Sequence, residues 1–153
     1  RPPMFKKILY PTDFSDVAAK ALDYIKQLKE AGSQEEVILH VIHQRIIDGL
    51  MRHAMQEDDI VEWQKAAKAV ARESLAEMSS DLESMGFAVK TIVKTGFPWR
   101  EILDVEKKEM PSIIVSGSHG RSAVGEIFLG SVSDRVIRKC RRPVMVIKRD
   151  PVD

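Results

Sequence analysis

Residues 113–133 read IIVSGSHGRSAVGEIFLGSVS. The apolar, β-branched start of this stretch predicts a strand buried on both faces. Gly117 and Gly120 interrupt it, and Gly130 precedes a helical pattern that opens with Ser131. A strand, a glycine-rich loop and a helix start can form a phosphate cradle, because helix N-terminal N–H groups favour negative charge. The alternative is that these glycines only form turns.

The rest of the chain alternates strands with helices. Helices are expected over 17–31, from about residue 60 to Gly86, from Pro98 to Met110, and over 132–139, with Ser15 or Asp16 capping the first. Strands are expected over 7–12, 36–42, 87–94, 112–116 and 144–147. Alternating β and α units predict an α/β fold: a single doubly wound, five-stranded parallel sheet.

A strand order of 3-2-1-4-5 would reverse between the first and fourth strands. Parallel sheets bind ligands beyond their C-terminal ends at such a reversal. We therefore expect Pro11, Thr12 and Asp13 to lie beside the segment from Ser116 to Gly120, a hundred residues away along the chain.

Composition gives no support for a nucleic-acid-binding, membrane-spanning or disulfide-bonded protein. The chain has 153 residues, 44% of them hydrophobic, and a net charge of +1. This near-neutral charge gives no reason to expect a nucleic acid or an acidic membrane as partner. No apolar run is long enough to span a membrane. Cys140, the single cysteine, excludes an internal disulfide and fits a reducing compartment. We expect a cytoplasmic protein.

The segment from Gln44 to Asp59 is the least readable part of the sequence. Its mixture of apolar and charged residues is compatible with a loop, a short helix or a mobile flap. In the long helix that follows, core packing is predicted for one stripe of side chains at helical spacing. The stripe consists of Trp63, Ala67, Val70, Ser74, Met78, Leu82 and Met85. His40, His43 and His53 have no convincing metal-ligand spacing, and structural roles are expected for them.

These motifs resemble the nucleotide-binding branch of the universal stress protein family. The resemblance rests on PTDFS at 11–15, on Gly117-x2-Gly120-x9-Gly130-Ser131, and on PVMV at 143–146. It implies one domain over residues 4–149 with an adenine nucleotide alpha hydrolase-like fold, which binds ATP or AMP. The implied ligand contacts are Pro11, Thr12, Asp13, Val41, Gly117, Ser118, His119, Gly120, Arg121, Gly130, Ser131, Val132 and Ser133.

Each polar site residue also has a plainer interpretation. Arg121 could bind phosphate or be a solvated loop arginine, and His119 could contact the ligand or be exposed and neutral. Ser131 and Ser133 could hold an anion, cap the helix, or do both. Asp13 would be repelled by phosphate, so it should contact ribose, help to hold Mg²⁺ or Mn²⁺, or stabilise a turn.

Three functions remain open on the sequence. The first is a nucleotide-binding signalling or stress-response module with little or no turnover, acting on a downstream protein that the sequence does not identify. The second is a slow ATPase or nucleotidyl-transfer enzyme, against which stands the absence of a P-loop lysine. The third is an interaction module without nucleotide. The all-apolar last strand, Val144–Ile147, predicts an exposed edge and a two-fold homodimer.

Overall fold

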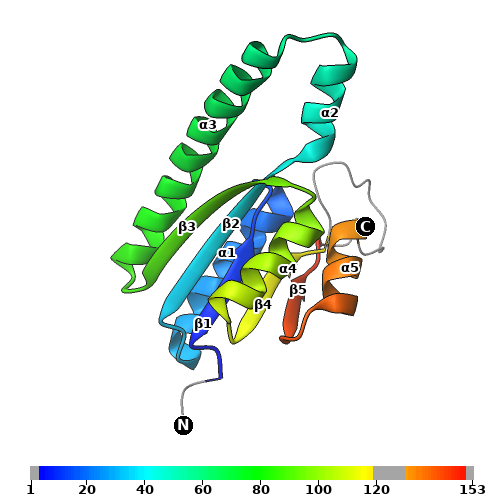
Figure 1. The fold of residues 1–153 in the computed structure, drawn as a ribbon. Coiled ribbons are helices and arrows are strands. Elements are labelled where there is room, and N and C mark those ends of the chain that lie inside the picture. The colour runs from blue at the N-terminus through cyan, green and yellow to red at the C-terminus, as the bar shows by residue number, and fades with distance from the viewer. Residues whose placement is uncertain (1–3, 119–129, 151–153) are drawn as a thin grey trace.

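A five-stranded parallel sheet with the order β3-β2-β1-β4-β5 forms the centre of the molecule. The structure is a computed structural model that describes residues 4–118 and 130–150. Figure 1 shows the sheet with helices on both faces. The predicted fold class and strand order are confirmed. The strands are β1 (Lys7–Pro11), β2 (Glu35–His43), β3 (Ala88–Gly96), β4 (Ile113–Gly117) and β5 (Val144–Ile147).

Local signals set the ends of the helices. The Ser15 hydroxyl accepts a hydrogen bond from Ala18 N at 3.2 Å and so caps the first helix, while Pro98 is the first residue of the fourth. Both arrangements follow the predicted signals, since a hydroxyl satisfies a free N–H and proline needs no amide partner there. The helices are α1 (Asp16–Leu28), continued by a 3₁₀ turn (Lys29–Ala31), α2 (Gln44–Arg52), α3 (Glu57–Ser84), α4 (Pro98–Glu109) and α5 (Ser131–Lys139).

Two apolar cores cover the two faces of the sheet. Side chains from α1 and α3, including Ile25 and Leu75, pack on one face, and side chains from α4 and α5, including Ile102 and Val136, pack on the other. Successive residues of a strand point to opposite faces, so Val37 joins the second core and Ile38 the first. The same alternation places Glu36 on the α1–α3 face, where its side chain is buried.

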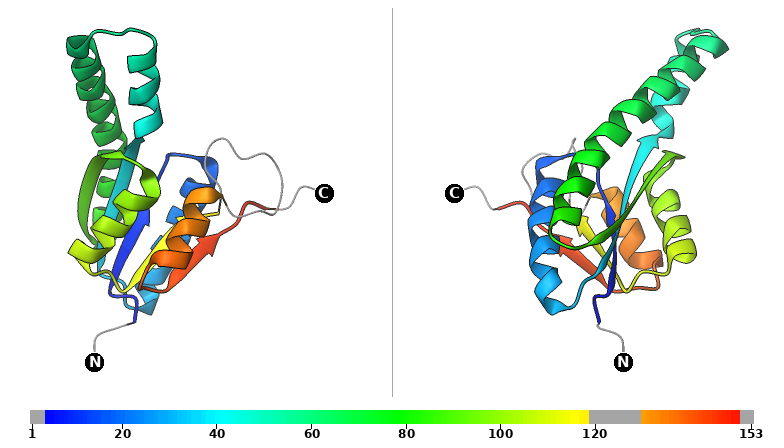
Figure 2. Two further views of the ribbon diagram at one scale, coloured as in Figure 1. Left: turned by 45° about the vertical axis from the view of Figure 1, so that its right-hand side comes forward. Right: turned by 90° about the vertical axis from the view of Figure 1, so that its left-hand side faces the viewer.

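Residues 44–59, whose structure the sequence left open, and the long helix α3 form a helical hairpin, α2–α3. Of the alternatives for residues 44–59, the short helix is confirmed, as α2 occupies the first part. Figures 1 and 2 show the hairpin rising beyond the C-terminal ends of β2 and β3, rather than across those of β1 and β4. This segment therefore does not form a flap over the C-terminal ends of β1 and β4.

The predicted core stripe of α3 is only partly correct. Leu82 is buried, but Val70 is 64% exposed, and the other buried side chains of the helix are Ile60, Ala71 and Leu75. The reason is that α3 packs on the sheet only along its second half, while its first half belongs to the hairpin. In the described part of the chain, no helix combines the length and apolar character needed to cross a bilayer.

Candidate functional site

The C-terminal ends of β1 and β4 lie side by side, as the strand order requires. Ile8 and Leu9 are in register with Ile113 and Ile114, so the residues after Pro11 and Ser116 meet at one edge of the sheet. The buried Tyr10 hydroxyl donates a hydrogen bond to the Ala18 carbonyl and fixes β1 against α1. Burial raises the pKa of Tyr10 to about 12, so the phenol keeps its proton.

A tight turn follows β1 and places the first group of predicted site residues. Phe14 N donates to Thr12 Oγ1 at 3.1 Å, and Ser15 N donates to Asp13 Oδ1 at 2.9 Å. These bonds hold Phe14 in a left-handed conformation with φ 62°, which is uncommon for a bulky residue. Asp13 therefore has the turn-stabilising role, and its Oδ2 accepts no hydrogen bond from the described residues.

His40 of β2 has a structural role, as expected, but sequence reasoning did not identify its partners in the turn, Thr12 and Phe14. His40 Nδ1 lies 2.8 Å from the Thr12 carbonyl oxygen, and the His40 and Phe14 rings stack with centroids 4.5 Å apart. Thr12 N also donates to Leu39 O at 2.8 Å. The only sequence signal was the position of His40 near the end of a strand, and that position does not identify its partner.

Gly117 allows a close approach between β4 and α1. A Cβ atom at this position would lie 2.8 Å from Val17 Cγ1, closer than real Cβ contacts come. Next to it, Ser118 N donates to Ile147 O at 2.8 Å, and Gly130 N donates to Ser118 O at 2.7 Å. Ser118 and Gly130 thus bring the end of β4 directly to the start of α5. His119, Gly120 and Arg121 lie outside the described residues.

The N-terminus of α5 faces this edge, and no side chain of the described residues caps it. Gly130 is the N-cap residue. The first-turn N–H groups of Ser131, Val132 and Ser133 have no acceptors within the helix. Ser131 is exposed, whereas the Ser133 hydroxyl donates to Gly117 O at 2.8 Å. Ser133 is thereby left with its backbone N–H, rather than its hydroxyl, for a ligand.

Val41 lies at the same edge, on the side of β2. Pro11 at the end of β1 is in register with Leu39, so Val41 is two residues further along, beside the turn after β1. Val41 is half-buried at the border of the α4–α5 core. The structure thus places Pro11, Thr12, Asp13, Val41, Gly117, Ser118 and Gly130–Ser133 at the C-terminal edge of three adjacent strands.

No metal-binding cluster marks this edge in the described part of the chain. Among residues 4–118 and 130–150, no three His, Cys, Asp or Glu side chains are grouped to hold a metal. A cavity of about 580 Å³ lies elsewhere, between α1 and the segment after β5, and none of the predicted site residues lines it. Ion pairs of Asp16 with Arg149 and of Lys20 with Asp150 border this cavity. This cavity therefore lies where ion pairs hold the C-terminal segment against α1, and it is not part of the candidate site.

Known proteins share both the sequence and this arrangement. Residues 4–148 match the model of the universal stress protein family. The chain belongs to this family. Universal stress protein MJ0577 of Methanocaldococcus jannaschii is 38% identical over 156 aligned residues, with 95% of this chain and 96% of that protein covered.

Solved structures agree with the family assignment. The structure of MJ0577 superposes with a TM-score of 0.88 at 39% identity and covers 97% of this chain and 99% of the other. A universal stress protein solved in complex with cAMP superposes at 0.65 with 17% identity, covering 94% of this chain and 97% of its own. One from Archaeoglobus fulgidus in complex with dAMP superposes at 0.60 with 22% identity, covering 95% and 99%. At 17% and 22% identity, the last two comparisons show only that the fold is shared.

Proposed function

We propose that this universal stress protein binds an adenine nucleotide, ATP or AMP, at the C-terminal edge of β1 and β4. It would act as a stress-response or signalling module whose nucleotide state alters its protein contacts, with little or no turnover. The observation that carries the proposal is the first turn of α5 beside Gly117, which no side chain of the described residues caps, because first-turn N–H groups favour an anion. Two proteins with the same fold bind cAMP and dAMP, which are adenine nucleotides.

The described residues suit distinct parts of such a ligand. The amides of Ser131, Val132 and Ser133 would hold phosphate oxygens, and the exposed Ser131 hydroxyl would add a further donor. The backbone of Val41 would meet the adenine, since β2 ends on that side of the crevice. Asp13 Oδ2 would accept a ribose hydroxyl or share Mg²⁺ or Mn²⁺ with the phosphates, because its other oxygen is bound to Ser15 N.

Turnover has little support in the sequence. The chain contains no Gly-Lys-Ser or Gly-Lys-Thr, so the phosphate-binding lysine and metal-binding hydroxyl of a P-loop are missing. We infer that a bound nucleotide persists, and that its identity is the signal.

Retention of nucleotide tests the proposal directly. Purified protein is denatured, and the released small molecules are identified by mass spectrometry, followed by thermal-shift titration with ATP, AMP and GTP. We expect ATP or AMP to be released, or to raise the melting temperature more than GTP does. The absence of both a released nucleotide and a thermal shift would contradict nucleotide binding. Steady formation of ADP would contradict the absence of turnover.

The variant Ser131→Asp separates loss of the site from loss of the fold. A carboxylate in the first turn stabilises a helix but repels phosphate, so binding should fall by about tenfold or more while the melting temperature is kept. Gln56→Asp is the matched control, because it adds the same charge at the start of α3, at the far tip of the hairpin. Equal weakening by both variants would contradict a phosphate site at α5.

We also infer a homodimer that is joined through β5. This strand is an edge of the sheet, and Val144, Met145 and Val146 are half-buried, with one side of the strand unpaired in the single chain. Pairing with the same strand of a second copy would continue the sheet across a two-fold axis.

A further inference from the structure

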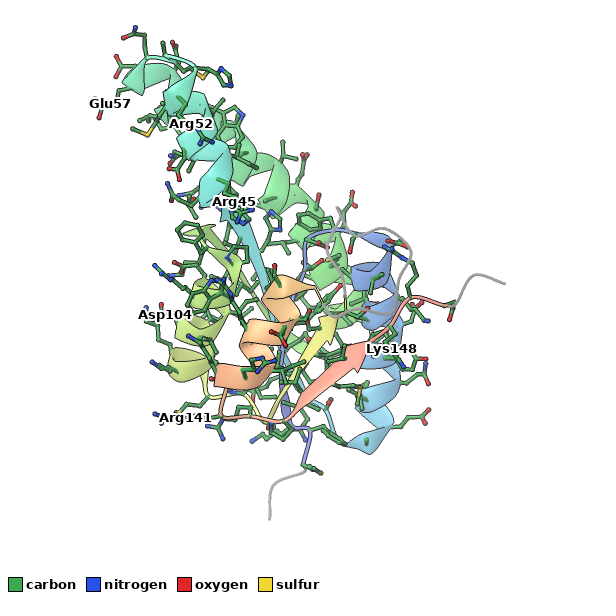
Figure 3. All side chains as sticks on the ribbon, turned by 90° about the vertical axis from the view of Figure 1, so that its right-hand side faces the viewer. Arg45, Arg52, Glu57, Asp104, Arg141 and Lys148 are labelled. Atoms are coloured by element: carbon green, nitrogen blue, oxygen red, sulfur yellow. The ribbon has the colours of Figure 1, made fainter. Side chains whose placement is uncertain are left out.

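Three cations surround one indole ring between α4 and α5. Arg135 and Lys139 of α5 lie 5.2 and 4.7 Å from the centroid of the Trp99 ring, and Arg100 of α4 lies 5.1 Å from it. Trp99 packs against the apolar core beneath α4 and α5, and this packing fixes the position of the ring. Figure 3 looks onto this face of the molecule, with Asp104 of α4 and Arg141 after α5 labelled.

None of these three cations is neutralised within the described part of the chain. Arg100, Arg135 and Lys139 form no ion pair with any described carboxylate. All three side chains are exposed. A cation–π contact compensates part of their mutual repulsion, but an exposed one contributes only about 0.5–1 kcal/mol.

Of the five carboxylates of the two helices, Glu101 has no ion pair within the described residues, and Glu109 pairs with Lys90 at 2.9 Å. The other three also have partners elsewhere. Asp104 pairs with Lys108 at 3.1 Å, and Asp134 pairs with Arg138 at 3.0 Å. The buried Glu106 carboxylate accepts the backbone N–H groups of Arg141 and Arg142 at 3.0 and 3.2 Å.

Positive charge is concentrated in the segment that contains α5. The net charge of the whole chain is only +1, yet residues 131–142 carry five cations and a single carboxylate. This segregation, together with unpaired cations at a fixed ring, is typical of a surface that receives an anionic partner.

We propose that the surface formed by Trp99, Arg100, Arg135 and Lys139 docks an acidic polypeptide segment of a partner protein. Carboxylates of the segment can bind the outward edges of the three cations that lie over the Trp99 ring. This inference does not rest on nucleotide binding, because its residues differ from those proposed to hold the nucleotide.

The geometry favours a polypeptide over two other anions. Single-stranded nucleic acid binds by stacking bases on aromatic faces. Here the cations already occupy the Trp99 ring, so no base can stack on it without displacing them. A free phosphate needs donors that converge on a single point, whereas these three cations are distributed around the Trp99 ring.

A labelled acidic peptide tests the proposal on the full chain. In a Trp63→Phe background, Trp99 is the single tryptophan and its emission reports on this surface. A fluorescein-labelled oligoglutamate of about ten residues is titrated at about 50 mM salt, where screening is modest. We expect saturable binding by fluorescence anisotropy, a change in Trp99 emission, and loss of binding as salt rises.

Matched triple variants locate the binding. R100Q/R135Q/K139Q should weaken peptide binding by about tenfold or more, since each ion pair adds a modest, salt-screened increment. R52Q/K68Q/R72Q removes the same charge from α2 and α3 and should change binding less than about twofold. Circular dichroism and thermal melting check that both variants remain folded.

Three outcomes would overturn the proposal. The first is no saturable peptide binding at low salt, and the second is an equal loss in both triple variants, which would indicate attraction by net charge alone. The third is tighter binding of an oligothymidylate of the same length through the same three side chains, which would make this a nucleic-acid surface.

Discussion

Glu36 is a charged residue type in an apolar core. Its side chain is 1% exposed, and neither carboxylate oxygen has a hydrogen-bond partner among the described residues. Burial raises the pKa of Glu36 well above its ordinary value of 4.5, so the folded protein holds this carboxyl protonated. Glu36 lies between Ile8 of β1 and Val89 of β3, and its buried carboxyl lowers the free energy of unfolding.

The pH dependence of stability should reveal this cost. Above pH 4.5 the unfolded chain loses the proton that the folded chain keeps, so stability falls by up to about 1.4 kcal/mol per pH unit as pH rises. Glu36→Met should remove this fall and raise the free energy of unfolding at neutral pH by about 1 kcal/mol or more. Urea denaturation between acidic and mildly alkaline pH measures both effects.

The adjacent residue provides the control. Glu35 precedes Glu36 on β2 and is only half-buried, with its side chain on the opposite face of the sheet. Glu35→Met should leave the pH slope unchanged. If Glu36→Met kept the wild-type slope, the buried carboxyl would not be its source.

At the scale of elements, the start of α2 depends on a histidine cap. His43 Nδ1 accepts a hydrogen bond from Arg45 N at 3.1 Å, which requires the neutral ring. Burial and the nearby Arg45 lower the pKa of His43 below its ordinary 6.5. The unfolded chain therefore takes up the proton first, so the cap contributes stability above pH 6.5 that is lost as pH falls.

Hydrogen exchange at α2 measures this dependence. Relative to intrinsic rates, protection of the Arg45 amide should fall between mildly alkaline and mildly acidic pH in the wild type. His43→Asn keeps a neutral acceptor at the cap and should abolish the change. His53→Gln at the other end of α2 should behave as wild type, and a pH effect that persisted in His43→Asn would exclude the cap as its cause.

Elements with strong local signals were predictable, whereas elements that depend on long-range packing were not. The strand runs, Ser15 and Pro98 specify their structures locally, and α1, α4 and β5 formed near the expected residues. In α3 the apolar spacing fits more than one face, and only packing against the sheet selects Ala71 and Leu75 over Val70.

At the scale of the whole molecule, topology made the candidate site predictable. Once strand order places β1 beside β4, Thr12 and Gly117 must share an edge. Two details required three-dimensional contacts that have no sequence period, namely the stacking of His40 on Phe14 and the gathering of three cations at Trp99. Both join residues from different elements.

The proposed homodimer depends on the open edge of β5. Pro143 O and Ile147 O accept hydrogen bonds from Ile114 N and Ser118 N, so odd-numbered positions of β5 face β4. Val144 and Val146 therefore direct their N–H and C=O groups to the open edge, where a second copy would pair.

Proline at residue 146 tests this pairing without breaking the sheet. Val146→Pro removes one outward N–H and no bond to β4, and edge strands tolerate such a proline. Thr91→Pro is the matched control on the other edge, because Ala88 N donates to Gln34 O and odd-numbered positions of β3 thus face outward. In sedimentation velocity, wild type and Thr91→Pro should form a dimer of the 17.3 kDa chain, and Val146→Pro a monomer. A Val146→Pro dimer as tight as wild type would place the interface elsewhere, since pairing through β5 loses one of its outward donors in this variant.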